Sequence, residues 1–131
     1  MFIDSSALTA ILLHEPDMAE LRAKLKRTRR YTSPIVIYET ALAVARNGNK
    51  PLSEAESTVI DLLRAFRVQI LPIEVRHASI ALDAFGRFGK GKHRAALNMG
   101  DCFSYASAKI QNIPLLFKGN DFIHVDDIVL A

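Results

Sequence analysis

Residues 1–13, MFIDSSALTAILL, decide the fold class. The apolar pair Phe2-Ile3 predicts a short strand that ends at Asp4. Ser5 or Ser6 is then placed to cap a helix, because a serine hydroxyl accepts hydrogen bonds from the free N–H groups of a first helical turn. A strand that passes directly into a helix is the unit from which parallel α/β sheets are built. The start of the chain therefore predicts an α/β protein.

The same alternation of short strands and amphipathic helices continues along the chain. Ser53-Glu54-Ala55-Glu56 matches a capping box, and Pro34 suits the first position of a helix. The β-prone run Ile35-Val36-Ile37 leaves a strand there as the alternative. We expect further helices over residues 17–26, 34–46, 53–66, 75–85 and 101–111, and further strands over residues 68–71, 115–117 and 128–130. This order predicts a single domain over residues 1–131, a three-layer α/β/α domain with a mostly parallel central sheet.

The composition is that of an ordinary globular domain. Half of the 131 residues are hydrophobic, and the net charge of +3 permits a nucleic-acid partner without requiring one. The single cysteine, Cys102, excludes an intramolecular disulfide and fits a reducing cytoplasm. No export signal and no membrane-spanning run is visible, so we expect a soluble cytoplasmic protein.

Three acidic residues stand at junctions between predicted elements. Asp4 directly follows the first strand, and Asp121 follows the strand over 115–117 after a tight turn. Asp101 opens a helix directly after Gly100. Ligands of parallel α/β sheets bind beyond the carboxyl ends of the strands, so these three carboxylates are expected to converge there.

Glu39 gives a different argument for the same site. On the predicted helix its neighbours one turn away are Ile35 and Leu42, which places the acid on an apolar face. A buried carboxylate without a partner is costly, and the nearest basic residue on that face, Arg46, lies two turns on. A divalent cation bound by Glu39 and other acids would offset the free-energy cost of burying this charge.

Each acid also has a purely structural interpretation. Asp4 can cap the first helix, Asp101 can complement a helix dipole, and Asp121 can be an ordinary turn residue. Glu39 can have a plain structural role as well. The four support a common site only if the fold brings them together.

Four blocks of sequence resemble the PIN-domain ribonuclease toxins of the VapC type, which belong to type II toxin–antitoxin systems. Their order and separation match along essentially the whole chain, and the last two blocks form a specific pair. The blocks are FIDSS at residues 2–6, Tyr38-Glu39, LNMGDCFSYA at 97–106 and LLFKGNDF at 115–122.

The resemblance implies a PIN-like fold, Mg²⁺ or Mn²⁺ as cofactor, and cleavage of structured RNA. It also implies a cognate antitoxin that blocks the site, and a homodimer. The acidic positions of the family carry over onto four residues and its supporting polar positions onto two more: Asp4, Glu39, Asp101 and Asp121, with Ser6 and Asn98. One departure is Val125, which stands where the family often has threonine.

These acids fit metal-dependent hydrolysis of a phosphodiester. Mg²⁺ prefers oxygen ligands, and paired ions in such enzymes activate water and stabilise the leaving oxygen. We expect Asp4, Glu39 and Asp101 to form a first metal site, and Asp121 to complete or attract a second when RNA is bound.

The basic, glycine-rich segment 86–94 precedes Asp101. It resembles a phosphate-binding loop, but His93 stands where the Mg²⁺-binding hydroxyl is required and no strand precedes it, so a nucleotide triphosphatase is rejected. The segment either contacts RNA phosphates or is a solvated loop. The candidate RNA-binding residues are Arg87, Lys90, Lys92 and Arg94.

Two other functions remain open alongside the toxin ribonuclease. One is a PIN-type nuclease that processes RNA or DNA flaps, and the other is a non-catalytic RNA- or protein-binding module. The carboxylates argue against the module, because a surface that binds anionic RNA gains nothing from clustered acids. Cys102 is expected to pack inside its helix, since no activating base is evident for a nucleophile.

Overall fold

The computed structural model describes all residues from Met1 to Ala131 and is built around one sheet whose four strands all run parallel. The strands are β1 (Phe2–Ile3), β2 (Tyr31–Thr32), β3 (Gln69–Ile70) and β4 (Leu115–Leu116). Their order in the sheet is β3-β2-β1-β4, so β1 lies in the interior between β2 and β4. The β-prone first residues of the chain therefore form the centre of the molecule.

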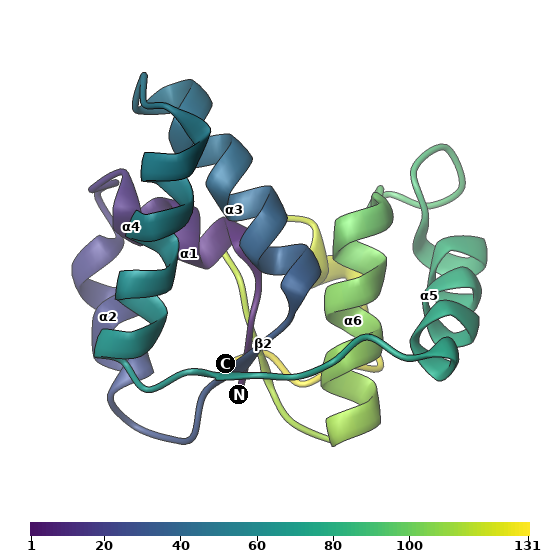
Figure 1. The fold of residues 1–131 in the computed structure, drawn as a ribbon. Helices are drawn as coiled ribbons and strands as arrows, with labels where there is room; N and C mark the ends of the chain where they lie inside the picture. The colour runs from purple at the N-terminus through teal and green to yellow at the C-terminus, as the bar shows by residue number, and fades with distance from the viewer.

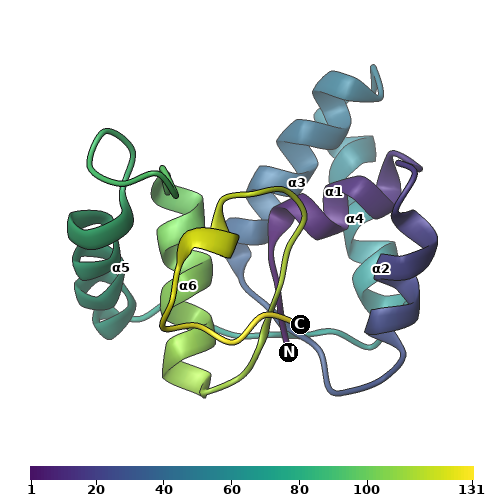
Figure 2. The same ribbon diagram turned by 180° about the vertical axis from the view of Figure 1, so that it is seen from behind.

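Helices connect the strands and cover the sheet. They are α1 (Ser5–Leu12), α2 (Met18–Leu25), α3 (Pro34–Asn47), α4 (Leu52–Ala65), α5 (Val75–Phe88) and α6 (Met99–Gln111), followed by a short 3-10 helix, η1 (Phe122–His124). α5 and α6 stand on one side of the sheet, and α1, α2 and α4 on the other (Figures 1 and 2). α3 packs against α1 and α4 and also touches α6. The predicted three-layer α/β architecture is confirmed.

The register of the sheet brings separate parts of the chain to one edge. Ile3 pairs with Leu116, and the backbone N–H of Asp4 donates to the Leu116 carbonyl at 2.9 Å. The residues of β1 and β4 are completely buried, as expected of parallel strands covered on both faces. Because all strands run the same way, the segments after β1, β2 and β4 leave the sheet at the same end.

The ambiguous segment at Ile35-Val36-Ile37 is helical. Ser33 caps α3 by accepting a hydrogen bond from the Val36 N–H at 3.4 Å, and Pro34 occupies the first turn. The strand of this region is β2, which lies just before Ser33 and was not indicated by the sequence pattern. Serine followed by proline was the stronger signal, because together they fix the start of a helix.

The predictions for the start of α4 and for a last strand are wrong. α4 begins at Leu52 after Pro51 without any side-chain cap, so Ser53 lies inside the helix and forms no capping box. At the other end of the chain, Leu130 makes only a single bridge to Leu115, so residues 128–130 are not a strand. The remaining predicted helices and strands are present, with ends shifted by a few residues.

No helix in the structure combines the length and the apolar character needed to cross a membrane.

Candidate active site

Asp4 stands at the carboxyl end of β1 and accepts hydrogen bonds on both carboxylate oxygens. Oδ2 accepts from the Ser6 N–H at 3.0 Å and from the Ser6 hydroxyl at 2.6 Å, while Oδ1 accepts from the Ser104 hydroxyl at 2.6 Å. Only 2% of the residue is exposed. Asp4 itself is the N-cap of α1, so the prediction that Ser5 or Ser6 caps this helix is wrong. Its capping role fixes the carboxylate in one orientation.

Asp101 lies in the first turn of α6 and is held by Asn98. The Asn98 side chain accepts from the Asp101 N–H at 2.9 Å, and Asp101 Oδ2 accepts from the Asn98 N–H at 3.0 Å. Burial raises the pKa of Asp101 to about 7, and the charges of Asp4, Asp121 and Glu39 add to the increase, against the Asn98 hydrogen bond. The expected supporting position of Asn98 thus corresponds to a direct contact.

Glu39 reaches the same place from α3. Its carboxylate lies against Gly100 of α6, so close that a Cβ atom on Gly100 would come within 2.5 Å of it. Glu39 Oε1 is buried and has no hydrogen-bond partner. Burial raises the pKa of Glu39 to about 7, the charge of Asp4 adds to this, and the nearby Ser5 hydroxyl opposes it.

Asp121 is the outermost of the four acids. It is exposed and directly precedes η1, after a turn in which Gly119 adopts a φ of 105° that favours glycine. Its charge acts on Asp101, whose pKa it helps to raise. The structure therefore brings Asp4, Glu39 and Asp101 together as buried or half-buried groups, with Asp121 at the solvent edge.

These acids match a divalent cation in chemistry and do not form a finished cage. No three acidic, histidine or cysteine side chains are placed so that they can hold one ion together. Glu39 Oε1 has no hydrogen-bond partner, however, and burial with the neighbouring acids raises the pKa of both Glu39 and Asp101, so negative charge in the cluster is poorly compensated. Carboxylate oxygens are the donors that hard divalent cations prefer, so the four acids fit such an ion in their chemistry.

Comparison with known proteins identifies the family. A model of the PIN domain family matches residues 1–128. Ribonuclease VapC30 of Mycobacterium tuberculosis is 41% identical over the whole of this chain and 98% of its own length. A VapC ribonuclease of Rhizobium meliloti is 36% identical over 95% of this chain and 97% of its own length. The chain belongs to the PIN-domain family of VapC ribonucleases.

Solved structures agree on the fold of this PIN domain. VapC20 of Mycobacterium tuberculosis, described as a toxin that cleaves the sarcin-ricin loop, superposes with a TM-score of 0.78 at 16% identity, over 99% of this chain and 97% of the other. A VapBC2 complex of Rickettsia felis, bound to DNA from its promoter, gives a TM-score of 0.70 at 15% identity, over 99% and 96%. The likeness at this identity concerns the fold alone.

The basic residues before α6 of this PIN domain fall into two groups. The Arg87 guanidinium is already engaged, since it donates to Asp83, to Asp127 and to the Tyr105 hydroxyl at 3.0, 3.2 and 2.8 Å. Three others are exposed in the loop that connects α5 to α6, and none of them forms an ion pair: Lys90, Lys92 and Arg94. Only this second group has charge available for a phosphate.

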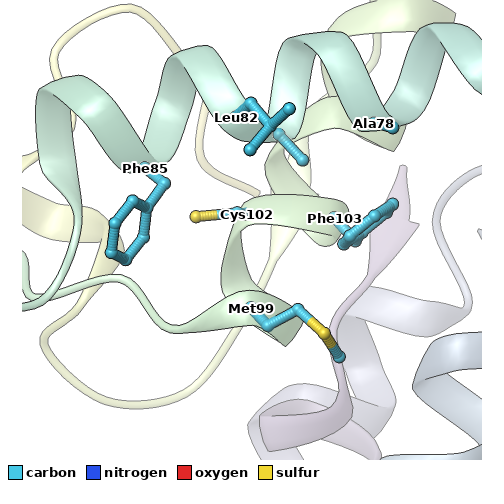
Figure 3. Close-up of a pocket in the computed structure, with 7 residues that line it drawn as sticks. Ala78, Leu82, Phe85, Met99, Cys102 and Phe103 are labelled. Atoms are coloured by element: carbon cyan, nitrogen blue, oxygen red, sulfur yellow. The ribbon is translucent and has the colours of Figure 1, made fainter.

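An apolar groove lies beside the acids, between α5 and α6. Its volume is about 320 Å³, and every lining side chain is hydrophobic. Leu82 and Phe85 enter it from α5, and Met99, Cys102 and Phe103 from α6 (Figure 3). Cys102 is buried, as expected of a packing residue, and burial with the charge of Asp101 raises the pKa of its thiol to about 11, which disfavours the nucleophilic thiolate.

Ser104 is the site residue that sequence reasoning missed. It is 1% exposed and its hydroxyl donates to Asp4, a hundred residues earlier in the chain. Its position three residues after Asp101, on the same side of α6, was the available signal. Ser6, in contrast, was expected from the resemblance, and it also accepts from the Lys118 N–H at 2.9 Å, which ties the segment after β4 to the start of α1.

Proposed function

We propose that this chain is the toxin of a type II toxin–antitoxin system, an endoribonuclease that hydrolyses RNA phosphodiester bonds at its acid cluster. Relatives that are 33–41% identical to this chain are named VapC ribonucleases, and the similarity covers nearly their full lengths. The observation that carries the proposal is the buried Glu39 Oε1, which has no hydrogen-bond partner and lies in a cluster with Asp4 and Asp101. A polar atom left unpaired in a buried site is costly unless a ligand satisfies it.

We propose Mg²⁺ or Mn²⁺ as the cofactor, held by Asp4, Glu39 and Asp101, with Asp121 available to a second ion at the exposed edge. A bound divalent ion supplies a water of lowered pKa and neutralises charge that develops on the phosphate. The protein holds the carboxylate oxygens in fixed orientations for the ion. Ser6 and Ser104 fix the Asp4 carboxylate, and Asn98 fixes that of Asp101.

The RNA backbone is proposed to pass the loop between α5 and α6. Lys90, Lys92 and Arg94 are exposed there, shortly before Asp101, and such residues bind phosphates by charge without reading the sequence. Arg87 was included in the predicted set, but its side chain already serves Asp83, Tyr105 and Asp127. We therefore assign it to the packing of α5 against α6 and the C-terminal segment.

A cognate antitoxin, a homodimer and a cytoplasmic location complete the proposal. Two structural neighbours were solved as toxin–antitoxin assemblies, from Klebsiella pneumoniae and Rickettsia felis, which supports an antitoxin partner for this fold. The exposed apolar side chains on α3, α4 and α5 offer surface for protein partners, among them Tyr38, Leu52 and Leu82. We also propose a single domain over residues 1–131, which the family match over residues 1–128 supports.

The test compares the wild-type chain with Asp101→Asn and with Asp61→Asn, an exposed acid on α4 that serves as control. Each protein is incubated with purified ribosomal and transfer RNA in Mn²⁺ or in EDTA, and the new RNA ends are sequenced. We expect wild type and Asp61→Asn to cleave only with Mn²⁺, and Asp101→Asn to cleave roughly a hundredfold more slowly or not at all.

Two outcomes contradict the proposal. Full activity of folded Asp101→Asn removes the acid cluster from the mechanism. RNA binding that is equal in Mn²⁺ and EDTA, without cleavage in either, favours a non-catalytic binding module on the same fold.

A further inference from the structure

We propose that Gly100 is a positioning residue, because the absence of its side chain leaves the space in which the Glu39 carboxylate lies beside Asp101. The inference rests on the proposed function and extends the site to a residue without any polar group. Gly100 is fully buried in the first turn of α6, and Glu39 reaches it from α3, on a different element of the fold.

The contact between the two residues leaves no room for a Cβ atom at position 100 while the Glu39 carboxylate keeps its present position. A Cβ atom built on Gly100 would lie 2.0 Å from Glu39 Oε2, 2.4 Å from Cδ and 2.5 Å from Oε1. Its three nearest heavy atoms therefore all belong to the Glu39 carboxylate. Separations below 3.0 Å are essentially never found for real Cβ atoms. Alanine at 100 and the present position of the Glu39 carboxylate exclude each other.

Glu39 is the partner that yields to such a side chain. Gly100 has an ordinary helical backbone without positive φ, so alanine fits the helix and has the higher helix propensity. The start of α6 is held by the reciprocal Asn98 and Asp101 hydrogen bonds. The carboxylate, in contrast, ends a flexible side chain with no partner on Oε1. Gly100→Ala is therefore expected to move Glu39 away from Asp101 and leave the fold in place.

Gly86 provides the matched control. It lies in α5, and a Cβ built on it meets no atom within 4 Å. Gly86→Ala makes the same chemical change in a helix that packs against α6, without touching the acid cluster. Any effect of replacing glycine in a helix as such appears in both variants, and any effect on Glu39 appears only in Gly100→Ala.

The experiment measures the binding of Mn²⁺ alone by titration calorimetry, together with thermal unfolding of the metal-free proteins and cleavage of RNA. For Gly100→Ala we expect Mn²⁺ binding to weaken by roughly tenfold or more, in the range found when the supporting contacts of metal ligands are removed. Its melting temperature should equal or exceed that of wild type. Gly86→Ala should bind Mn²⁺ like wild type.

A compensating change separates positioning from general damage. Glu39→Asp shortens the acid by one methylene, so it should weaken Mn²⁺ binding in the wild-type background. In the Gly100→Ala background the shorter side chain clears the added methyl group, so the double variant should bind Mn²⁺ more tightly than Gly100→Ala alone. Such non-additivity is the signature of two groups in direct contact.

Several results overturn the inference. Wild-type Mn²⁺ binding by Gly100→Ala would do so, as would equal losses in Gly86→Ala, or additive effects in the double variant. An unfolded Gly100→Ala protein would also contradict it, because the carboxylate and not the helix is said to yield. If Glu39→Gln retains full Mn²⁺ binding and RNA cleavage, the proposed function fails at Glu39 itself, and that outcome is distinct from the others.

Discussion

Ser104 and Ser107 are two buried serines on one helix, and only Ser104 touches the acid cluster. The Ser104 hydroxyl donates to Asp4 Oδ1 at 2.6 Å, whereas the Ser107 hydroxyl donates to the carbonyl of Phe103 in its own helix at 2.9 Å. A hydrogen bond to a carboxylate orients the group and favours its charged form. The two residues therefore separate the effect on Asp4 from the effect of removing a buried hydroxyl.

We predict that Ser104→Ala slows RNA cleavage roughly tenfold to a hundredfold, as loss of a group that orients a metal ligand does. Ser107→Ala should cleave at the wild-type rate. Both variants should lose about 1 kcal/mol of unfolding free energy, since each removes one buried hydrogen bond. Initial cleavage rates in Mn²⁺ and urea denaturation check the two expectations. Equal cleavage rates in the two variants would assign Ser104 to packing alone.

The sequence predicted which acids lie at the site, but it did not predict the contacts that hold them there. Asp4 and Asp101 were placed correctly by their junctions, because parallel strands end at a common edge. Glu39 was expected to share an apolar face with Leu42, yet Leu42 is 39% exposed and Glu39 is half-buried against Gly100. Contacts such as Glu39 with Gly100, and Ser104 with Asp4, join residues far apart in sequence, so no local pattern reveals them.

At the scale of elements, α5 shows how an apolar stripe can mislead. The apolar residues whose spacing predicts this helix, Val75, Ala78, Leu82 and Phe85, are all exposed, with Val75 at 87% and Leu82 at 71%. The buried side of α5 carries two alanines, Ala81 at 4% and Ala84 at 0% exposure, between His77 and Phe88. Small side chains allow two helices to approach closely, and burial there depends on the partner helix, which periodicity alone does not report.

Truncating a leucine usually destabilises a helix more than enlarging an alanine does, and this packing predicts the opposite for α5. Ala84→Leu should destabilise the protein by roughly 1–3 kcal/mol, because the added atoms have no room between α5 and α6. Leu82→Ala should change the unfolding free energy by roughly 0.5 kcal/mol or less, since its side chain is mostly in solvent. Urea denaturation of both variants measures the difference. A loss as large for Leu82→Ala would show that this face is covered in solution.

The boundaries of helices and strands were predicted where local residues set them and missed where contacts with other elements set them. α3 was predicted at Pro34 because serine followed by proline fixes a helix start locally, and the structure confirms it. β2 was not predicted, since its two residues, Tyr31 and Thr32, are strand only through pairing with β1 and β3. The start of α4 was misplaced because Ser53 and Glu56 match the pattern of a capping box, whereas the helix begins before Ser53, at Leu52.

On the scale of the whole molecule, the fold gathers like charges that the unfolded chain keeps apart. Asp4 follows β1, Glu39 lies on α3, Asp101 opens α6, and Asp121 follows β4. Burial and mutual repulsion raise the pKa of Glu39 from 4.5 to about 7 and that of Asp101 from 3.8 to about 7. Between pH 4 and 7 the folded protein therefore binds more protons than the unfolded chain does. Stability linked to these groups is full at low pH and is lost as the pH rises through about 7.

We therefore predict that the metal-free protein is less stable near pH 8 than near pH 5, with these acids contributing roughly 1–3 kcal/mol to the difference. The pKa of the Met1 ammonium is lowered, so this group makes stability rise with pH and opposes the effect of the acids. Wild type must therefore be compared with a variant that retains Met1. The double variant Glu39→Gln, Asp101→Asn serves as this reference, because it retains Met1 and removes both carboxyl groups whose pKa is raised.

Urea denaturation in EDTA between pH 5 and pH 8 should show wild type losing stability with rising pH relative to the variant. Saturating Mn²⁺ should reduce the loss, because a cation favours the charged carboxylates. Parallel pH curves in EDTA would mean that Glu39 and Asp101 are well solvated in the metal-free protein, and that the fold exerts no strain on them for a cation to relieve.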